Sequence, residues 1–257
     1  TPMAAAVFAM EVVSVGVMYY AALLPCVIAS IIAAEFATGV GLNPETFPVA
    51  RIPQLSLESG LKMAVIAAGC GLLSILFCVA LKAVSGIYGK YLKNPYLRVC
   101  VAGCLVIGIT MLLGTGDYMG AGNELIARAV EQGKARPLDF LWKMILTAIT
   151  MRAGYRGGEI VPAFSVGATF GCVAGGLLGF SPEVAAAASM VALFCGVTNC
   201  PIASMLISFE LFGFSGAAYY LIAISISYAL SGYYSLYKDQ TIVYSKYKAR
   251  YINKKTH

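Results

Sequence analysis

Charged residues are scarce in this chain. Only 12% of its 257 residues are Asp, Glu, Lys or Arg, whereas 60% are hydrophobic and the mean hydropathy is +0.80. A soluble domain is about a quarter charged and about half apolar. No soluble fold of this length could bury so much apolar surface, so the composition excludes a soluble domain. It predicts a polytopic helical membrane protein.

Histidine is nearly absent, because the only one is His257 at the end of the chain. A cysteine/histidine metal site and a catalytic Ser/His or His/Glu pair each need a histidine within the fold. We therefore expect no enzyme activity, no catalytic residues, no metal and no cofactor. The eight cysteines lie mostly inside apolar runs, where we expect small packing residues rather than disulfides.

Positive charge is not spread evenly along the chain. The net charge of +6 comes mainly from two basic clusters, one within 82–98 and one within the tail 238–257. In a membrane protein such clusters mark the cytoplasmic side, and they also attract anionic lipid headgroups. The charge is therefore not evidence for a nucleic-acid partner. It predicts a cytoplasmic tail that contacts membrane lipid.

Many apolar segments are too short to cross a bilayer, which needs about 20 residues. We expect longer spans at 17–34 (with a kink at Pro25), 58–85 and 99–113. Short helices are expected at 3–13, 140–152, 163–180, 182–196, 201–212 and 216–230. Broken helices at membrane depth are tolerated where they are buried or line a cavity, and their ends can point at a bound ion. The pattern predicts ion or solute translocation.

One stretch, "YRGGEIVPAF" at 155–164, concentrates residues that disfavour an ordinary span. Gly157 and Gly158 allow positive φ and close backbone approach, and Pro162 suits a first helical turn. A helix is therefore predicted to begin near Ile160. The N–H groups of Glu159 and Ile160 would then be free donors at a positive dipole end, which is an anion site. In a membrane core such donors need a partner, although a helix start without a ligand is common in soluble proteins.

The segment "GGEIVPAFSVGATFG" resembles the G-x-F-x-P anion-binding motif of the CLC family of chloride channels and anion/proton antiporters, of prokaryotic type. Four more stretches resemble other segments of the family, in the same order along the chain: "TPMAAAVFAMEV", "LLGTGDYMGAGNELI", "LFCGVTNCPIASMLISFELFG" and "SGYYSLYKDQ". The resemblance covers essentially this whole chain but only the carboxyl-terminal portion of a CLC subunit.

The resemblance implies an all-α polytopic membrane fold, a CLC-type bundle of tilted, broken and re-entrant helices. Residues 1–237 would form the transmembrane domain, followed by the basic cytoplasmic tail 238–257. Within that domain, 1–35 would end the first inverted repeat and 58–237 would form the second repeat.

The same resemblance implies the site residues. The bound anion would contact the backbone at Gly158, Glu159 and Ile160 and the hydroxyl of Tyr237. Gly157, Val161 and Pro162 would support the motif. Without the family, Tyr237 would be interpreted as an interfacial belt tyrosine.

Two positions depart from the usual family pattern. Glu159 stands where most members have an apolar residue. The fluoride-exporting branch has glutamate there, but with a threonine where this chain has Val161. We hypothesise that Glu159 is a proton carrier or gate, because an acid inside a membrane protein is functional by default. Val12 takes the place of the usual proton-relay glutamate, so Glu11 is expected to be structural.

The expected function is transmembrane transport of chloride-like anions in the voltage-gated chloride channel family, by a channel or an exchanger. A fluoride/proton antiporter ranks second. A non-conducting truncated subunit that needs a partner chain is a further alternative. Its support is that two family signatures, a serine-bearing loop and a G-x-E-x-P with the gating glutamate, are absent and would precede Thr1. The amino-terminal half of the pore is therefore expected to lie outside this chain.

The resemblance also implies a homodimer in the bacterial inner (plasma) membrane, with chloride or fluoride as the ligand. Five further charged residues have plainer interpretations. Arg152 and Arg156 flank the anion motif and either attract anions or mark a water interface. Glu210 is expected to cap or pair within the bundle, and Asp117 and Glu124 to form a helix-capping and surface pair.

Overall fold

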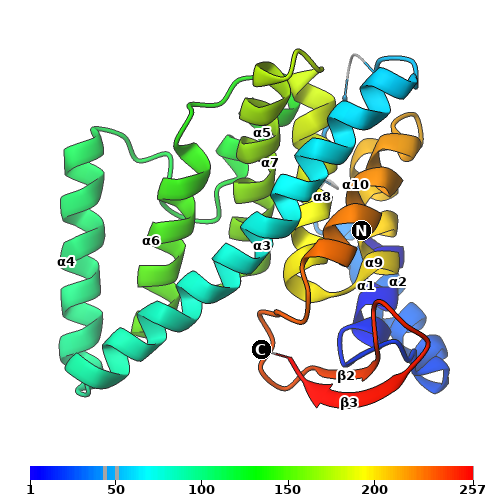
Figure 1. Cartoon of the computed structure of the whole chain (residues 1–257). Helices are drawn as coiled ribbons and strands as arrows, with labels where there is room; N and C mark the ends of the chain where they lie inside the picture. The colour runs from blue at the N-terminus through cyan, green and yellow to red at the C-terminus, as the bar shows by residue number, and fades with distance from the viewer. Residues whose placement is uncertain (43–44, 50–51, 257) are drawn as a thin grey trace.

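The computed structural model describes residues 1–42, 45–49 and 52–256, so His257 lies outside the described residues. The described chain is mostly helical (Figure 1). Its elements in chain order are α1 (Pro2–Glu11), β1 (Ser14–Val15), η1 (Tyr20–Ala22), α2 (Leu23–Gly39), α3 (Leu57–Tyr91), α4 (Pro95–Leu113), α5 (Asn123–Glu131), α6 (Asp139–Ala153), α7 (Ile160–Leu177), α8 (Pro182–Thr198), α9 (Pro201–Phe212), α10 (Ala217–Leu230), β2 (Thr241–Tyr244) and β3 (Tyr251–Lys255).

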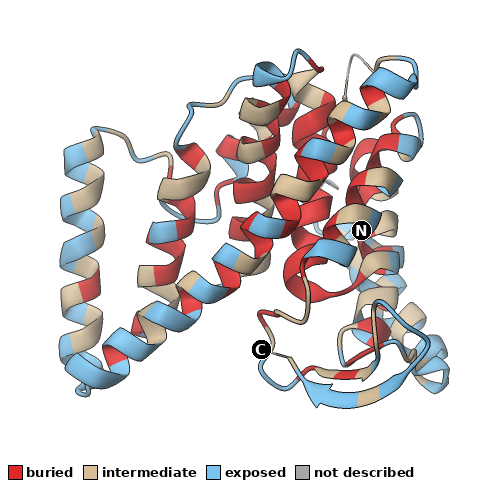
Figure 2. Cartoon of the chain, in the orientation of Figure 1, coloured by how far each residue is buried: buried red, intermediate tan, exposed pale blue. Residues whose placement is uncertain are grey.

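Long and short apolar helices are mixed, as the sequence predicted, but the helix expected to be short at 163–180 is α7, which is among the long ones. Four described helical segments are long and apolar enough to span a membrane: Tyr20–Gly39, Leu57–Tyr91, Pro95–Leu113 and Ile160–Leu177. α1, α8, α9 and α10 are apolar but have only 10–17 residues. α4 and α2 are exposed along most of their length, whereas α7 and α8 lie at the buried centre (Figure 2).

The predictions for three helices, α2, α3 and α4, were wrong in part. Pro25 is the third residue of α2, so it lies in the first turn, where its missing N–H breaks no hydrogen bond, and it does not kink a longer helix. α3 continues to Tyr91 rather than ending near 85, and α4 begins at Pro95 rather than 99. The break between them is local: the Asn94 side chain accepts a hydrogen bond from the Tyr96 N–H at 3.0 Å.

The centre of the bundle is the packing of α7 against α8. The face of α7 that packs against α8 carries a glycine at every fourth position: Gly167, Gly171 and Gly175. A Cβ at Gly171 would overlap the Ala185 carbonyl oxygen and the Ser189 side chain. Small residues at this spacing let two helix backbones approach closely, which supplies the van der Waals contact that holds membrane helices together.

α1 and α9 cap each other with buried or half-buried carboxylates. Glu11, in the last turn of α1, accepts hydrogen bonds from the N–H groups of Ile202 and Ala203 at 3.1 and 2.8 Å. Glu210, on α9, accepts from the N–H groups of Met3 and Ala4 at 3.0 and 3.1 Å. Each helix start thus receives an anionic cap from the other helix, which confirms the structural interpretation of both acids.

Glu11 offers a stability prediction. Truncating it in Glu11→Ala leaves two N–H groups of α9 without acceptors, so we expect about 2 to 3 kcal/mol of destabilisation. Thermal unfolding of the purified protein in detergent would measure the effect. Glu35→Ala, at an exposed position of α2, is the control and should leave the transition unchanged. Equal transitions for the two variants would contradict a capping role.

The carboxyl-terminal tail folds back onto the helices, which the sequence did not predict. β1, β2 and β3 form one sheet in that order, with β1 parallel to β2 and β2 antiparallel to β3. The Gln240 amide donates to the carbonyls of Val12 and Thr198 at 2.9 and 2.7 Å. This ties the tail to the end of α1 and to the end of α8 (Figure 1).

Asp117, in the loop before α5, belongs to a charge cluster with residues of α5, of α6 and of the turn between them. Arg128 binds Asp117 at 3.0 Å and the buried Asp139 at 3.2 Å, and Arg136 lies 3.7 Å from Asp117. Hydrogen bonding to Arg128 lowers the pKa of Asp117 from its ordinary value. Asp117 therefore pairs with arginines and does not cap α5, whose N-cap is Gly122, whereas Glu124 lies exposed in the first turn of α5.

Candidate functional site

The start of α7 forms where the sequence predicts it. α6 ends at Ala153 and is followed by Gly154, whose φ of 114° only glycine adopts readily, and α7 begins at Ile160. Glu159 occupies the N-cap position, but no described side chain caps the start of α7. The helix therefore presents uncapped N–H groups at its positive end, with the exposed Gly157 and Gly158 directly before it.

The Glu159 side chain turns toward α6. Its Oε1 lies 3.0 Å from Nη2 of Arg152, in the last turn of that helix, and the two side chains are only 20% and 22% exposed. The Nε of Arg152 is buried without a hydrogen-bond partner among the described residues. Arg152 thus neutralises the acid of the motif, a role that neither sequence interpretation of this arginine included.

Tyr237 lies in the loop after α10, and the end of α8 fixes this loop. The Leu236 N–H donates to the Val197 carbonyl at 2.9 Å, and the Asn199 amide donates to the Tyr234 carbonyl at 3.0 Å. The Tyr237 ring is half-buried, and its centroid lies 6.4 Å from that of Phe8. The tyrosine is therefore held inside the bundle, beside α1.

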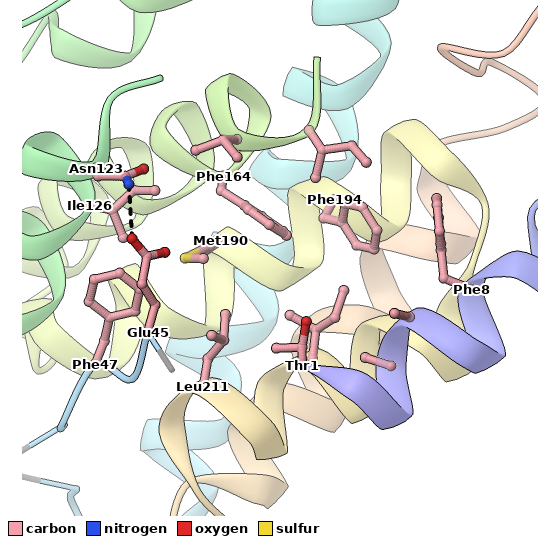
Figure 3. A pocket seen from close by; sticks show the side chains of 15 residues that line it. Thr1, Phe8, Glu45, Phe47, Asn123, Ile126, Phe164, Met190, Phe194 and Leu211 are labelled. Carbon is pink, nitrogen blue, oxygen red and sulfur yellow. Dashed lines mark hydrogen bonds between the residues drawn. The ribbon is translucent and has the colours of Figure 1, made fainter. Parts of the chain in front are cut away.

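A row of aromatic rings connects Tyr237 to α7. Phe8 lies 5.5 Å from Phe194, and Phe194 lies 5.0 Å from Phe164, measured between ring centroids. Figure 3 shows these three phenylalanines along one wall of a cavity. The sequence did not identify this row, because its members come from α1, α7 and α8.

The cavity beside this row has a volume of about 440 Å³ and a mainly apolar lining. Ile160 and Val161, in the first turn of α7, contribute to its wall. The Asn123 amide donates to Oε1 of Glu45 at 3.0 Å near one end (Figure 3). The first turn of α7 therefore borders a cavity rather than packed protein on this side.

A second cavity, of about 460 Å³, borders the other side of the motif. Gly157, Gly158, Val161 and Pro162 all line it, together with residues of α4, α6 and the loop before α5. Val161 lines both cavities, so the start of α7 separates two open spaces. An uncapped helix start between two cavities can hold a small anion by backbone N–H groups and the helix dipole.

These features define a class: a helical membrane protein with broken helices, one of which begins without a side-chain cap beside two cavities. The particular family follows from comparison with known proteins. The family model described as "Voltage gated chloride channel" matches residues 1–232. The chain therefore belongs to the voltage-gated chloride channel family, also called CLC, and its fold is that of CLC transport proteins.

Individual relatives agree with this family. The chain is 33% identical over 255 residues to a chloride/fluoride channel protein of Pseudomonas syringae pv. tomato, covering 96% of this chain and 56% of that protein. It is 26% identical to an H(+)/Cl(-) exchange transporter ClcA of Vibrio cholerae, covering 82% and 48%. It superimposes with a TM-score of 0.89 on the crystal structure of a CLC-type fluoride/proton antiporter, at 30% identity, covering 93% and 61%. The chain thus spans about half to three fifths of these proteins.

The structure brings some predicted site residues together and adds others. Gly158, Glu159 and Ile160 lie together because they are consecutive, and Tyr237 approaches α1 and the aromatic row. Among the residues that the sequence analysis missed is Lys143, which is 1% exposed. A lone lysine within the apolar run "FLWKMIL" was the signal that could have identified it.

Proposed function

We propose that this chain supplies one side of a transmembrane anion pathway and that the uncapped start of α7 binds the transported anion. One observation supports this proposal most directly. The N–H groups of Glu159 and Ile160 lie at the start of a helix that has no side-chain cap and is bordered by two cavities. Burial of such donors in a membrane protein is costly unless a partner satisfies them. A chloride-like anion is the partner that the positive dipole end favours.

The Arg152–Glu159 ion pair supports a specific part for Glu159. While the carboxylate is bound to Arg152, it does not occupy the N–H groups of its own helix, so they stay open to an anion. Released from Arg152, the carboxylate would compete with the anion for these donors. We therefore propose that Glu159 acts as a gate or proton carrier whose position Arg152 sets.

Fluoride is the second candidate for the transported anion. The relative from Pseudomonas syringae is named a chloride/fluoride channel protein, and the superimposed crystal structure is of a fluoride/proton antiporter. Glu159 is the residue of this chain that the fluoride-exporting branch shares. Val161 stands where that branch has threonine, so chloride-like anions remain the first candidate.

Flux from liposomes tests the proposal. This chain would be reconstituted with the amino-terminal half of the pore supplied and with internal chloride or fluoride, as wild type and as Glu159→Gln. We expect anion efflux from the wild type. Proton uptake that accompanies fluoride efflux and disappears in Glu159→Gln would identify a proton carrier. Chloride efflux without proton movement, altered only in rate, would identify a channel with a gate.

The control for this experiment is Glu131→Gln, which removes an exposed carboxylate from the end of α5. It should transport like the wild type. Absence of efflux from wild-type liposomes, for both anions, would overturn the proposed function and favour a subunit that does not conduct.

We also propose that the protein is a homodimer of the bacterial plasma membrane with a cytoplasmic tail. The apolar side chains of α2 support a surface that needs lipid or protein cover, since large apolar patches rarely face water. Photobleaching steps of labelled single complexes would count subunits, and protease access to the tail in oriented vesicles would report its side. A single bleaching step would contradict the dimer.

A further inference from the structure

The carboxyl-terminal tail makes contacts beside Tyr237 that the proposed function does not use. The tail folds back so that its end lies beside the loop that follows α10, and Tyr237 belongs to this loop (Figure 1). Oγ1 of Thr256, directly after β3, donates to the Tyr237 carbonyl at 2.8 Å. The backbone N–H of Gln240 donates to the same carbonyl at 3.3 Å. The tail therefore holds the backbone that carries the Tyr237 hydroxyl.

Lys246 forms a second link between the tail and this loop. It lies between β2 and β3, it is half-buried, and its Nζ donates to Oδ1 of Asn199 at the end of α8. The Asn199 amide nitrogen in turn donates to the Tyr234 carbonyl at 3.0 Å, three residues before Tyr237. Because an ammonium can only donate, it fixes which end of the Asn199 amide accepts and leaves the other end to bind the loop.

The ammonium of Lys246 has no acidic partner among the described residues. Beside Asn199, its Nζ donates to Oγ of Ser231 at 3.0 Å and to the Tyr228 carbonyl at 3.3 Å, both at the end of α10. It also lies 4.3 Å from the centroid of the Tyr228 ring. Removing an ammonium from water without an acid is costly, so packing alone would favour an apolar side chain here. What the ammonium adds is one atom that joins the ends of α8 and α10 to the tail.

We propose that the folded tail positions Tyr237 for anion binding, and that Lys246 and Thr256 are the positioning residues through which it acts. Neither residue contacts the anion. Thr256 holds the Tyr237 carbonyl directly, whereas Lys246 holds the loop three residues earlier through Asn199. This inference rests on the proposed function, in which the Tyr237 hydroxyl contacts the anion.

Anion flux as a function of anion concentration tests this positioning, in the liposomes described above with the amino-terminal half of the pore supplied. In Lys246→Met the side chain keeps its length but loses its donors, so the loop is released. We expect the apparent KM for the anion to rise about tenfold, the effect of one lost hydrogen bond to an anion. Turnover at saturating anion should change less than KM. Lys248→Met is the matched control, because it removes the same charge from an exposed position of the tail, and its KM should stay unchanged.

A double-mutant cycle separates positioning of Tyr237 from a general loss of stability. Tyr237→Phe deletes the hydroxyl and should itself raise KM. Adding Lys246→Met to Tyr237→Phe should raise KM no further, because the lysine acts through that hydroxyl. Equal effects of Lys246→Met in both backgrounds would overturn the positioning, and so would an unchanged KM in Tyr237→Phe.

A second variant covers the case in which Lys246→Met does not fold. Thr256→Val keeps the shape of the side chain and removes only the donor to the Tyr237 carbonyl. We expect a rise in KM that Tyr237→Phe masks. An unchanged KM in Thr256→Val would then overturn the proposal.

Hydrogen exchange of the purified protein separates this inference from the proposed function, because it needs no transport. The Leu236 N–H, bonded to the Val197 carbonyl at 2.9 Å, should exchange about tenfold faster in Lys246→Met, while peptides of α4 keep their rates. Failure of wild-type transport would overturn the proposed function, but faster exchange at Leu236 would still support the hold of Lys246 on the loop. Unchanged exchange at Leu236 would overturn the positioning, whatever the transport result.

Discussion

The variant Gly171→Leu is expected not to yield correctly folded protein. A side chain at this position would have to enter space occupied by the Ala185 carbonyl oxygen and the Ser189 side chain, and a backbone carbonyl cannot move aside cheaply. Overpacking a close interface costs about 3 kcal/mol at the upper end of the usual range, and here the clash begins at the first carbon. Size-exclusion chromatography and thermal unfolding of the detergent-solubilised protein would show the loss.

Gly176→Leu is the matched control for this prediction. Gly176 lies on the same helix, but nothing lies within 4 Å of a Cβ built there. It should elute and unfold like the wild type. If Gly171→Leu behaved like Gly176→Leu, the close packing of α7 against α8 would be wrong.

The second large effect is expected when the Arg152–Glu159 ion pair is broken from the arginine side. In Arg152→Gln the carboxylate loses its only described ion-pair partner while it remains 20% exposed. It should then turn to the N–H groups at the start of α7 and compete with the anion. We expect anion affinity to fall about tenfold, which corresponds to about 1.4 kcal/mol. Anion dependence of flux in liposomes would measure it.

A double-mutant cycle separates this competition from a general loss of positive charge. Arg152→Gln combined with Glu159→Gln removes both the cation and the competing carboxylate, so it should recover most of the affinity. If the double variant were as weak as Arg152→Gln alone, Arg152 would attract the anion directly. In that case the ion pair would not set the position of Glu159.

The start of α7 could be predicted from the sequence because it depends on residues that are close together in the chain. Gly157, Gly158 and Pro162 specify a loop followed by a helix start within a few residues, so the beginning of α7 at Ile160 needed no knowledge of its neighbours. Boundaries that depend on competition between signals were predicted less well. Pro25 is compatible both with a kink and with a first turn, and the structure has the first turn.

The tail illustrates a different limit. Its sequence shows a basic, tyrosine-rich segment, and this composition gives no indication of a partner strand. β2 pairs with β1 at Ser14 and Val15, more than two hundred residues earlier in the chain. A pairing over that separation is specified by the position of α1 and α8 in the fold, which a local pattern does not contain.

The sequence by itself determined that this is a membrane protein of broken helices, that a helix starts after Gly158 with free N–H groups, and that the motif belongs to one family. These features depend on composition and on residues close together in the chain. Only the tertiary structure decided that Arg152 neutralises Glu159, that Phe8, Phe164 and Phe194 connect α7 to Tyr237, and that Lys143 faces the second cavity. The reason is physical: charge compensation and ring packing depend on distance in space, and separate helices bring these groups together.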